Sequence, residues 1–183
     1  MEILGLLNQQ LVKLLEGVMP VLDSDWWNSL VLDKLTYQQK TFASSLPSPA
    51  LERLDLAALL RVADRNWYDI ASQGDFNRET RNWLKEAQSI RNRWAHAPAG
   101  GLPDDIRYRD IDTIERLLLA FGADSQTLGS IKQEKQKLLH RLAAVETQLA
   151  KTSTDSIAEN VYKPGDMVRL KAEPTKTPLQ EPA

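Results

Sequence analysis

The sequence predicts an all-α fold, in which an antiparallel helical bundle is followed by an amphipathic or coiled-coil helix and a disordered tail. Two observations support this prediction. Apolar residues recur three and four positions apart in five segments between residues 3 and 121, which places them on one face of each helix. Short stretches rich in proline, glycine and serine separate these segments, and no strand pattern interrupts them.

The first two helices are predicted over residues 3–18 and 26–44. The first carries leucine, isoleucine and valine at helical spacing, and the glycine and proline within residues 17–20 mark its end. Ser24-Asp25 is suited to cap the second, which has a bulky apolar stripe. The two prolines within residues 45–49 break this second helix.

Three more helices are predicted over residues 49–72, 77–96 and 104–121. Gly74 separates the first two, and a proline- and glycine-rich stretch after residue 97 stops the fourth helix. Asp104 or Asp105 can cap the fifth helix, and Gly122 is expected to close it.

Four tryptophans fall on helix faces rather than in loops: Trp26, Trp27, Trp67 and Trp83. We interpret them as packing residues rather than ligand-stacking residues, because buried aromatic side chains dominate core energetics.

The segment 124–151 has heptad spacing. Its repeating positions are Leu128, Ile131, Lys135, Leu138, Leu142, Val145 and Leu149. This spacing predicts a short coiled coil, formed in a dimer or against the bundle. The alternative is an amphipathic helix docked on its own domain. His140, on this helix, is interpreted as a solvated or seam-edge residue rather than a functional one.

The sequence therefore predicts three parts, which are a bundle at 1–123, a helix at 124–151 and a linker or tail at 152–183. Within the tail, residues 161–170 (VYKPGDMVRL) look like the opening turn and first strand of a small β-barrel. A single strand is not stable without a partner. The tail is therefore either disordered or the start of a truncated downstream domain.

Composition narrows the possible functions. The chain has no cysteine and only two histidines, far apart, so disulfides, thiolate chemistry and a metal centre are not expected, nor is a cofactor. The net charge of −2 means that any RNA contact has to come from a local patch. The first residues lack the basic region of a signal peptide, and their apolar run is interrupted, so we expect no membrane segment and a cytoplasmic location.

One short stretch, residues 90–97 (IRNRWAHA), combines residues that could carry chemistry. Asn92 and His96 are four apart and share a helix face, while Arg91 lies on the adjoining face, within reach of His96 if the helix ends before Pro98. Histidine can shuttle a proton near neutral pH, and arginine matches the oxygens of a phosphate. This set suits cleavage of RNA by attack of a 2′-hydroxyl on the neighbouring phosphorus, without a metal.

A plainer interpretation competes with this one. Basic residues close to a helix C-terminus interact favourably with the helix dipole and with its last carbonyl groups. Spacing alone favours that structural role for Arg91 and His96.

The motif Arg91-Asn92-x-x-x-His96 resembles the R-x4–6-H motif of the HEPN superfamily, including the polar residue after the arginine. Further segments resemble the Swt1-type HEPN domain over roughly residues 1–123. They are Leu54-Asp55-Leu56-x-x-Leu59-Leu60, Asn66-Trp67, residues 90–96 and Arg109-Asp110-x-Asp112-Thr113.

This resemblance implies a helical bundle that forms a homodimer, with two motifs facing each other in a composite RNA-cleaving site. It implies that His96 is the acid and base, Arg91 the phosphate stabiliser and Asn92 an orienting group. No catalytic role transfers to Arg93 or Trp94, and Trp94 is interpreted as a packing residue. The family's expected products are a 2′,3′-cyclic phosphate and a 5′-hydroxyl end.

Swt1-type HEPN domains look like N-terminal modules of helicases and ATPases in bacterial defence systems, which implies RNA as substrate and a helicase or ATPase as partner or downstream domain. Residues 163–170 resemble the strand that starts such a domain. The leading hypothesis is therefore a metal-independent endoribonuclease in antiphage defence or RNA processing. The alternative is a non-catalytic dimerisation, assembly or RNA-binding module of a larger system.

Overall fold

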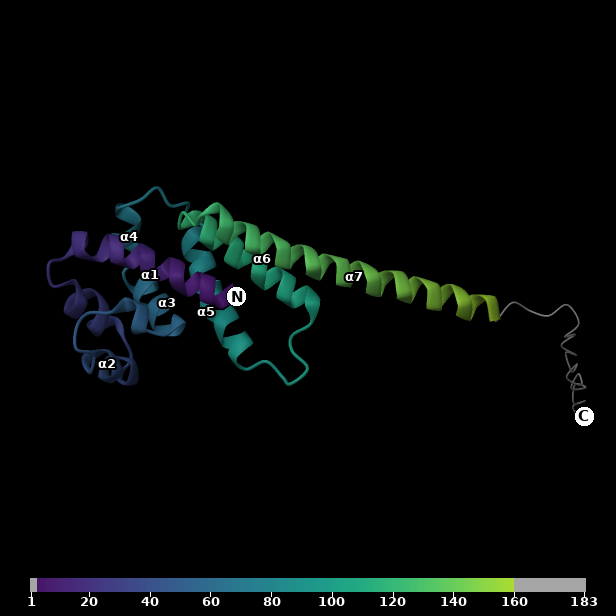
Figure 1. The fold of residues 1–183 in the computed structure, drawn as a ribbon, viewed down its shortest axis with the longest axis horizontal. Helices are drawn as coiled ribbons and strands as arrows, with labels where there is room; N and C mark the ends of the chain where they lie inside the picture. The colour runs from purple at the N-terminus through teal and green to yellow at the C-terminus, as the bar shows by residue number, and fades with distance from the viewer. Residues whose placement is uncertain (1–2, 160–183) are drawn as a thin grey trace, which may run out of the picture. The chain divides into compact units, whose positions relative to one another are not determined.

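The computed structural model describes residues 3–159, with side chains for residues 3–149, and every regular element in that part is helical (Figure 1). The predicted all-α fold is confirmed. The chain divides into two compact units, residues 1–144 and residues 145–183. The first unit contains the bundle.

Helix α1 (Ile3–Leu22) is longer than the sequence predicts, because it continues through Gly17 and Pro20. Met19 is fully buried and Leu22 packs against the core. Packing therefore keeps the last turn helical although Pro20 has no N–H to donate within it.

The predicted helix at 26–44 is divided. A π-helical turn (Trp27–Val31) and a 3-10 turn (Leu32–Lys34) precede helix α2 (Tyr37–Ser44). The break is at Leu35, whose backbone is extended. Thr36 then restarts the helix with a capping box, in which its hydroxyl accepts from the Gln39 N–H and the Gln39 side chain accepts from the Thr36 N–H.

The predicted helix at 49–72 is also divided, into a 3-10 turn (Leu51–Arg53), helix α3 (Leu56–Arg65) and helix α4 (Trp67–Ser72). Asp55 caps α3 by accepting a 2.8 Å hydrogen bond from the Ala58 N–H. The side chain of Asn66 separates α3 from α4. It donates to the carbonyls of Leu30 and Val62 at 2.7 and 2.8 Å.

Helices α5 (Thr80–Ala95) and α6 (Asp104–Ala120) form a hairpin and agree closely with the predicted ranges. The predicted closure of the fifth helix by Gly122 is confirmed. Gly122 has a φ of 70°, a conformation that glycine adopts without strain. The Ala123 N–H bonds the Leu118 carbonyl at 2.9 Å, which completes a Schellman turn.

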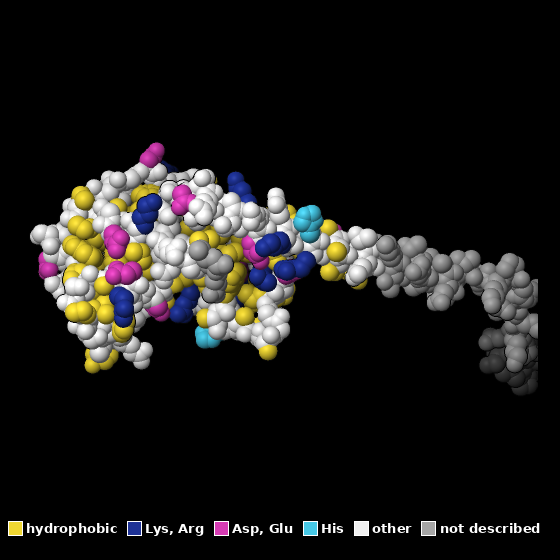
Figure 2. Space-filling view, viewed as in Figure 1, with side chains coloured by type: hydrophobic (Ala, Val, Ile, Leu, Met, Phe, Trp, Pro, Cys, Tyr) yellow, Lys and Arg dark blue, Asp and Glu magenta, His cyan; other side chains and the backbone are white. Residues whose placement is uncertain are grey.

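The core of the first unit joins one face of each long helix. Its largest fully buried side chains include Leu7, Leu11 and Leu15 of α1, Leu59 and Leu60 of α3, Leu84 and Ile90 of α5, and Ile111 and Ile114 of α6. Trp67 is buried, and Trp26, Trp27 and Trp83 pack against this core, so the packing role predicted for the four tryptophans is confirmed. On the face drawn in Figure 2, basic and acidic side chains are interspersed among hydrophobic ones.

Helix α7 (Ser125–Glu159) begins in the first unit and lies beside α6 there. Ile131 and Leu138 are fully buried in the core, as expected for a helix docked on its own domain. Lys135, the polar residue on the predicted seam, is paired with Asp112 at 2.5 Å and Glu115 at 2.7 Å of α6.

The helix extends beyond the predicted end at residue 151, because no proline or glycine occurs between Gly129 and Pro164. Val145, on the predicted seam, is 54% exposed. The strand predicted at 161–170, and the rest of the tail from residue 160, lie outside the described residues.

Candidate functional site

The candidate site occupies the C-terminal end of α5. Leu84, Ala87 and Ile90 bury one face of this helix in the core. The residues that follow Ile90 are therefore at the edge of the buried face or on the solvent side. The Arg91 side chain keeps about a third of its surface exposed, whereas Asn92 and His96 are exposed.

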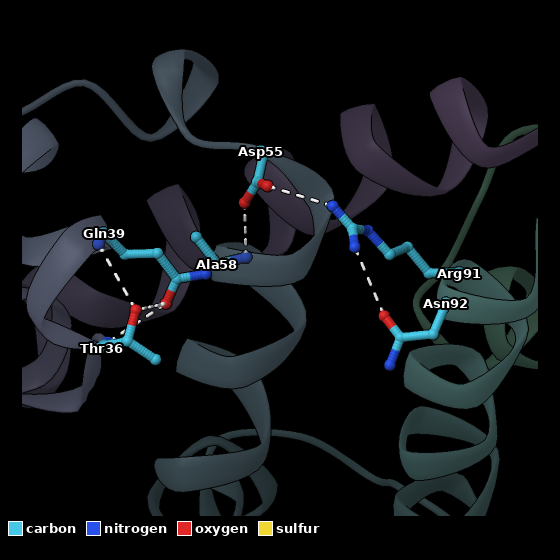
Figure 3. A network of polar contacts seen from close by, with 6 residues as sticks. All are labelled: Thr36, Gln39, Asp55, Ala58, Arg91 and Asn92. Carbon is cyan, nitrogen blue, oxygen red and sulfur yellow. Dashed lines mark hydrogen bonds and ion pairs between the residues drawn. The ribbon is translucent and has the colours of Figure 1, made fainter. Parts of the chain in front are cut away.

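The Arg91 guanidinium is held by two oxygen acceptors (Figure 3). Its Nη2 lies 3.3 Å from Oδ2 of Asp55, and its Nη1 donates to Oδ1 of Asn92 at 3.3 Å. The other oxygen of Asp55 caps α3 through the Ala58 N–H. One carboxylate thus determines where α3 begins and where the Arg91 side chain lies. The exposed part of the guanidinium can still bind an anion, because arginine has five donors.

His96 is the residue at which α5 ends. Its backbone N–H donates to the Asn92 carbonyl at 3.1 Å, and its φ of −110° departs from the helical value. Within the described residues the His96 imidazole makes no hydrogen bond and no ion pair. No hydrogen bond therefore joins the His96 imidazole to the Arg91 guanidinium. The structure joins Arg91 to Asn92, while the His96 imidazole faces solvent.

Helix geometry is consistent with the absence of a contact between Arg91 and His96. Five residues advance an α-helix by about 7.5 Å and rotate it by about 140°. Side chains at positions 91 and 96 therefore leave the helix in different directions. Regular helix geometry alone thus gives no reason to expect Arg91 and His96 of one copy to converge on the same phosphate.

Arg93 and Trp94 lie between Asn92 and His96 in the motif, and their side chains connect α5 to α6. Trp94 Nε1 donates to Oδ2 of Asp110 at 2.7 Å, and Arg93 Nη2 lies 3.3 Å from Oδ1 of the same residue. Asp110 is only 4% exposed. Trp94 also packs against the core, so the packing role predicted for it is confirmed. The interior of the motif thus holds the helix pair together.

Two grooves meet at Arg91. The larger, of about 520 Å³, lies beside the start of α1 and includes Asn8, Gln9 and Trp94. The smaller, of about 280 Å³, lies between α3 and α5 and is more polar. It is lined by Thr36, Gln39, Ala57, Leu60, Arg61, Asp64, Arg65, Gln88, Arg91 and Asn92. We call this second one the α3–α5 groove.

Sequence reasoning did not single out Asp55 or Asp110 as neighbours of the site. Asp55 carries an N-cap signal, because it immediately precedes an apolar helical pattern. That signal predicts the cap on Ala58. Its ion pair with Arg91 joins residues 36 positions apart and required the tertiary structure.

Two further properties concern cofactors and membranes. In the part of the chain that the structure describes, no group of three or more histidine, aspartate or glutamate side chains could hold a metal ion. No helix among residues 3–159 is both long and apolar enough to cross a membrane.

A model of the Swt1-like HEPN family matches residues 2–122. The matched segment begins at α1 and ends at the glycine that closes α6, so it includes every residue of the Arg91-Asn92-x-x-x-His96 motif and both of its aspartate partners. The comparison with curated proteins gave no match, and neither did the comparison with solved structures.

Proposed function

The chain belongs to the Swt1-like HEPN family, and from this we propose that it is a metal-independent endoribonuclease that acts as a homodimer. The observation that carries the proposal is the intact set Arg91, Asn92 and His96 at a solvent-facing helix end. The Arg91 guanidinium and the His96 imidazole are both accessible to a ligand there. The α3–α5 groove, which Arg91 and Asn92 line, leads to this position.

In the proposed reaction His96 removes the proton from a ribose 2′-hydroxyl. The 2′-oxygen attacks the adjacent phosphorus, and the bond to the 5′-oxygen breaks. The leaving 5′-oxygen takes up the proton that the His96 imidazolium gives back, so the products are a 2′,3′-cyclic phosphate and a 5′-hydroxyl end. Arg91 stabilises the negative charge on the phosphoryl oxygens, because its planar donors match them in geometry.

Asn92 has an orienting role in this proposal. Its side-chain oxygen accepts from Arg91 Nη1, which restricts the guanidinium to one of its rotamers. Asp55 restricts it from the other side. We regard Asn92 and Asp55 as positioning residues and Arg91 and His96 as catalytic ones.

The homodimer is proposed because no hydrogen bond joins Arg91 to His96 within one chain and helix geometry does not favour their convergence. A composite site satisfies the chemistry if the histidine of one copy faces the arginine of the other across a two-fold axis. Two equivalent sites then form from identical surfaces. The described structure contains one chain, so the dimer is part of the proposal.

The test is cleavage of a pool of single-stranded and structured RNA in the presence of EDTA. We expect the wild type to cut and Arg91→Ala and His96→Ala to lose at least about a hundredfold in rate. His140→Ala is the matched control, because His140 is the other histidine of the chain and is exposed on α7. It should cut like the wild type.

Two results would contradict the proposal. One is a folded wild-type dimer that leaves RNA uncut, and the other is His96→Ala cutting at the wild-type rate. The ends give an independent check, because a 5′-hydroxyl accepts phosphate from a polynucleotide kinase without prior dephosphorylation. The composite site can be tested by mixing Arg91→Ala with His96→Ala, since a mixed dimer retains one complete site and should recover activity.

We further propose that the activity serves antiphage defence or RNA processing, with a helicase or ATPase as partner or downstream domain. A toxic ribonuclease should arrest growth when it is expressed in bacteria, and His96→Ala should relieve the arrest. Equal growth in both cultures would argue against a toxic defence role.

A second candidate function is a non-catalytic assembly module. The observation that favours it is Val145, a valine on the predicted heptad seam that is 54% exposed. In this case α7 would pair two chains. Val145→Glu should then halve the molar mass in solution, while Ala144→Glu, an exposed position off the seam, should not. A dimer that survives both substitutions would place the interface on the bundle.

A further inference from the structure

The α3–α5 groove carries an excess of positive charge. Three of its lining residues are arginines, namely Arg61, Arg65 and Arg91. Its one carboxylate, Asp64, is already paired, since Oδ1 lies 3.4 Å from Nε of Arg81. This local excess contrasts with the net charge of −2 for the whole chain. Such a groove attracts anions even though the protein as a whole does not.

The two arginines of α3 are available to a ligand in different ways. Arg65 is exposed and makes no hydrogen bond or ion pair with any described residue. Arg61 donates from Nε to the Lys34 carbonyl at 2.6 Å, which anchors its stem. It forms no ion pair within residues 3–149, so its charge is not neutralised by a carboxylate there. The two residues are four apart on α3 and therefore share one face.

Neutral hydrogen-bonding groups complete the groove. Thr36 and Gln39 come from the start of α2, and Gln88 and Asn92 come from α5. The side-chain nitrogen of Gln88 donates to the Leu60 carbonyl at 3.4 Å. The side-chain oxygen of Gln88 can therefore still accept a hydrogen bond from a ligand. Amide side chains can both donate to and accept from ribose hydroxyls and base edges.

We propose that the α3–α5 groove binds the RNA strand beyond the scissile phosphate, with Arg61 and Arg65 contacting successive backbone phosphates. RNA as the ligand rests on the proposed function, because the groove is continuous with Arg91 and Asn92. Phosphate contacts of this kind position a strand without reading its sequence. The neighbouring amides can contact the ribose 2′-hydroxyls, which distinguish RNA from DNA.

The experiment measures binding of a fluorescent single-stranded RNA by anisotropy, in His96→Ala protein so that the RNA stays intact. Arg65→Glu is the main variant, and Arg78→Glu is its matched control, an exposed arginine outside the groove. We expect Arg65→Glu to raise Kd at least about tenfold and to lower the slope of log K against log salt by about 1. Arg78→Glu should change Kd by less than about threefold.

Folding is controlled by thermal unfolding of each variant. Arg65→Gln, which removes the charge without reversing it, should shift Kd in the same direction by a smaller factor. Arg61→Lys keeps the charge but loses the anchoring donor at Nε, and it should weaken binding less than Arg65→Glu. Equal Kd values for Arg65→Glu and Arg78→Glu would overturn the groove proposal, as would the absence of any RNA binding.

These outcomes are separable from the nuclease proposal. If the wild type cuts RNA in EDTA and Arg65→Glu behaves like Arg78→Glu, the nuclease stands and the groove is not its strand-binding site. If the wild type does not cut but Arg65→Glu alone weakens binding, the groove stands and the nuclease fails.

Discussion

The Asp55 carboxylate lies 3.3 Å from the guanidinium of Arg91 while its other oxygen caps helix α3. One side chain therefore couples the start of α3 to the functional end of α5. The Asp55 side chain is 58% exposed, so the ion pair itself adds little to the stability of the fold. Its consequence is the placement of the Arg91 side chain.

Substitutions of Asp55 should separate the cap from the ion pair. Asparagine caps helices as well as aspartate does, so Asp55→Asn should change the free energy of unfolding by less than about 0.5 kcal/mol. It removes the charge beside Arg91, and we expect RNA cleavage to fall about tenfold, through kcat rather than KM. Asp55→Ala should show the same fall in cleavage and should also lower the free energy of unfolding by about 1 kcal/mol, because alanine cannot cap α3.

Chemical denaturation and initial cleavage rates of the two Asp55 variants are the measurements. Full cleavage by a well-folded Asp55→Asn protein would show that the carboxylate does not position Arg91. Loss of stability in Asp55→Asn equal to that in Asp55→Ala would show that the cap depends on the charge.

Asp110 should be important for stability rather than for chemistry. It is buried and accepts from Trp94 Nε1 while pairing with Arg93. Asp110→Ala leaves the Trp94 N–H without its partner, and we expect a loss of about 2–3 kcal/mol in unfolding free energy by urea denaturation. Glu86→Ala, an exposed position on α5, is the control and should change it by less than about 0.5 kcal/mol.

The pairing of Lys135 with α6 predicts an acid-sensitive contact. The hydrogen bond from Lys135 lowers the pKa of the Asp112 carboxyl below its ordinary value. Its folded pKa is thus below the unfolded value of about 3.9, so its contribution to stability is complete above that value. The contribution is lost as the pH falls through the lower, folded pKa.

Thermal unfolding of Asp112→Asn between about pH 7 and about pH 2 tests whether the contact between Asp112 and Lys135 loses its contribution to stability in acid. The variant should be less stable than the wild type at neutral pH, and the two should converge in acid. Asp75→Asn, which replaces an exposed aspartate without an ion pair in the described residues, should follow the wild type throughout. A constant difference between Asp112→Asn and the wild type at every pH would contradict the assignment.

The capping box at Thr36 should set the start of α2. Thr36→Ala removes the acceptor for the Gln39 N–H, and we expect it to lower the free energy of unfolding by about 1 kcal/mol. Thr36→Ser keeps a hydroxyl and should stay within about 0.5 kcal/mol of the wild type. Denaturant titrations of the two variants measure this free energy. Equal losses in Thr36→Ala and Thr36→Ser would show that the threonine methyl group, rather than the hydroxyl, stabilises the start of α2.

Much of the bundle was predictable from local patterns. The ranges of α5 and α6, and the closure at Gly122, follow from apolar periodicity and from glycine conformation. The two divided helices were not predicted, although the Thr36-x-x-Gln39 pair and Asp55 are readable cap signals. Continuous apolar spacing on both sides of each break concealed those signals.

The helical class, the family and the order of Arg91, Asn92 and His96 along the chain can be read from local patterns, because periodicity and motif spacing are local properties. The partners of these residues depend on how the helices pack and could not be read from local patterns. Packing places Asp55 beside Arg91, joins Asp110 to the Trp94 side chain by a hydrogen bond, and puts Arg61 and Arg65 in the same groove as Asn92. Such contacts join residues distant in sequence, and the packing of α3, α5 and α6 through their apolar faces selects them.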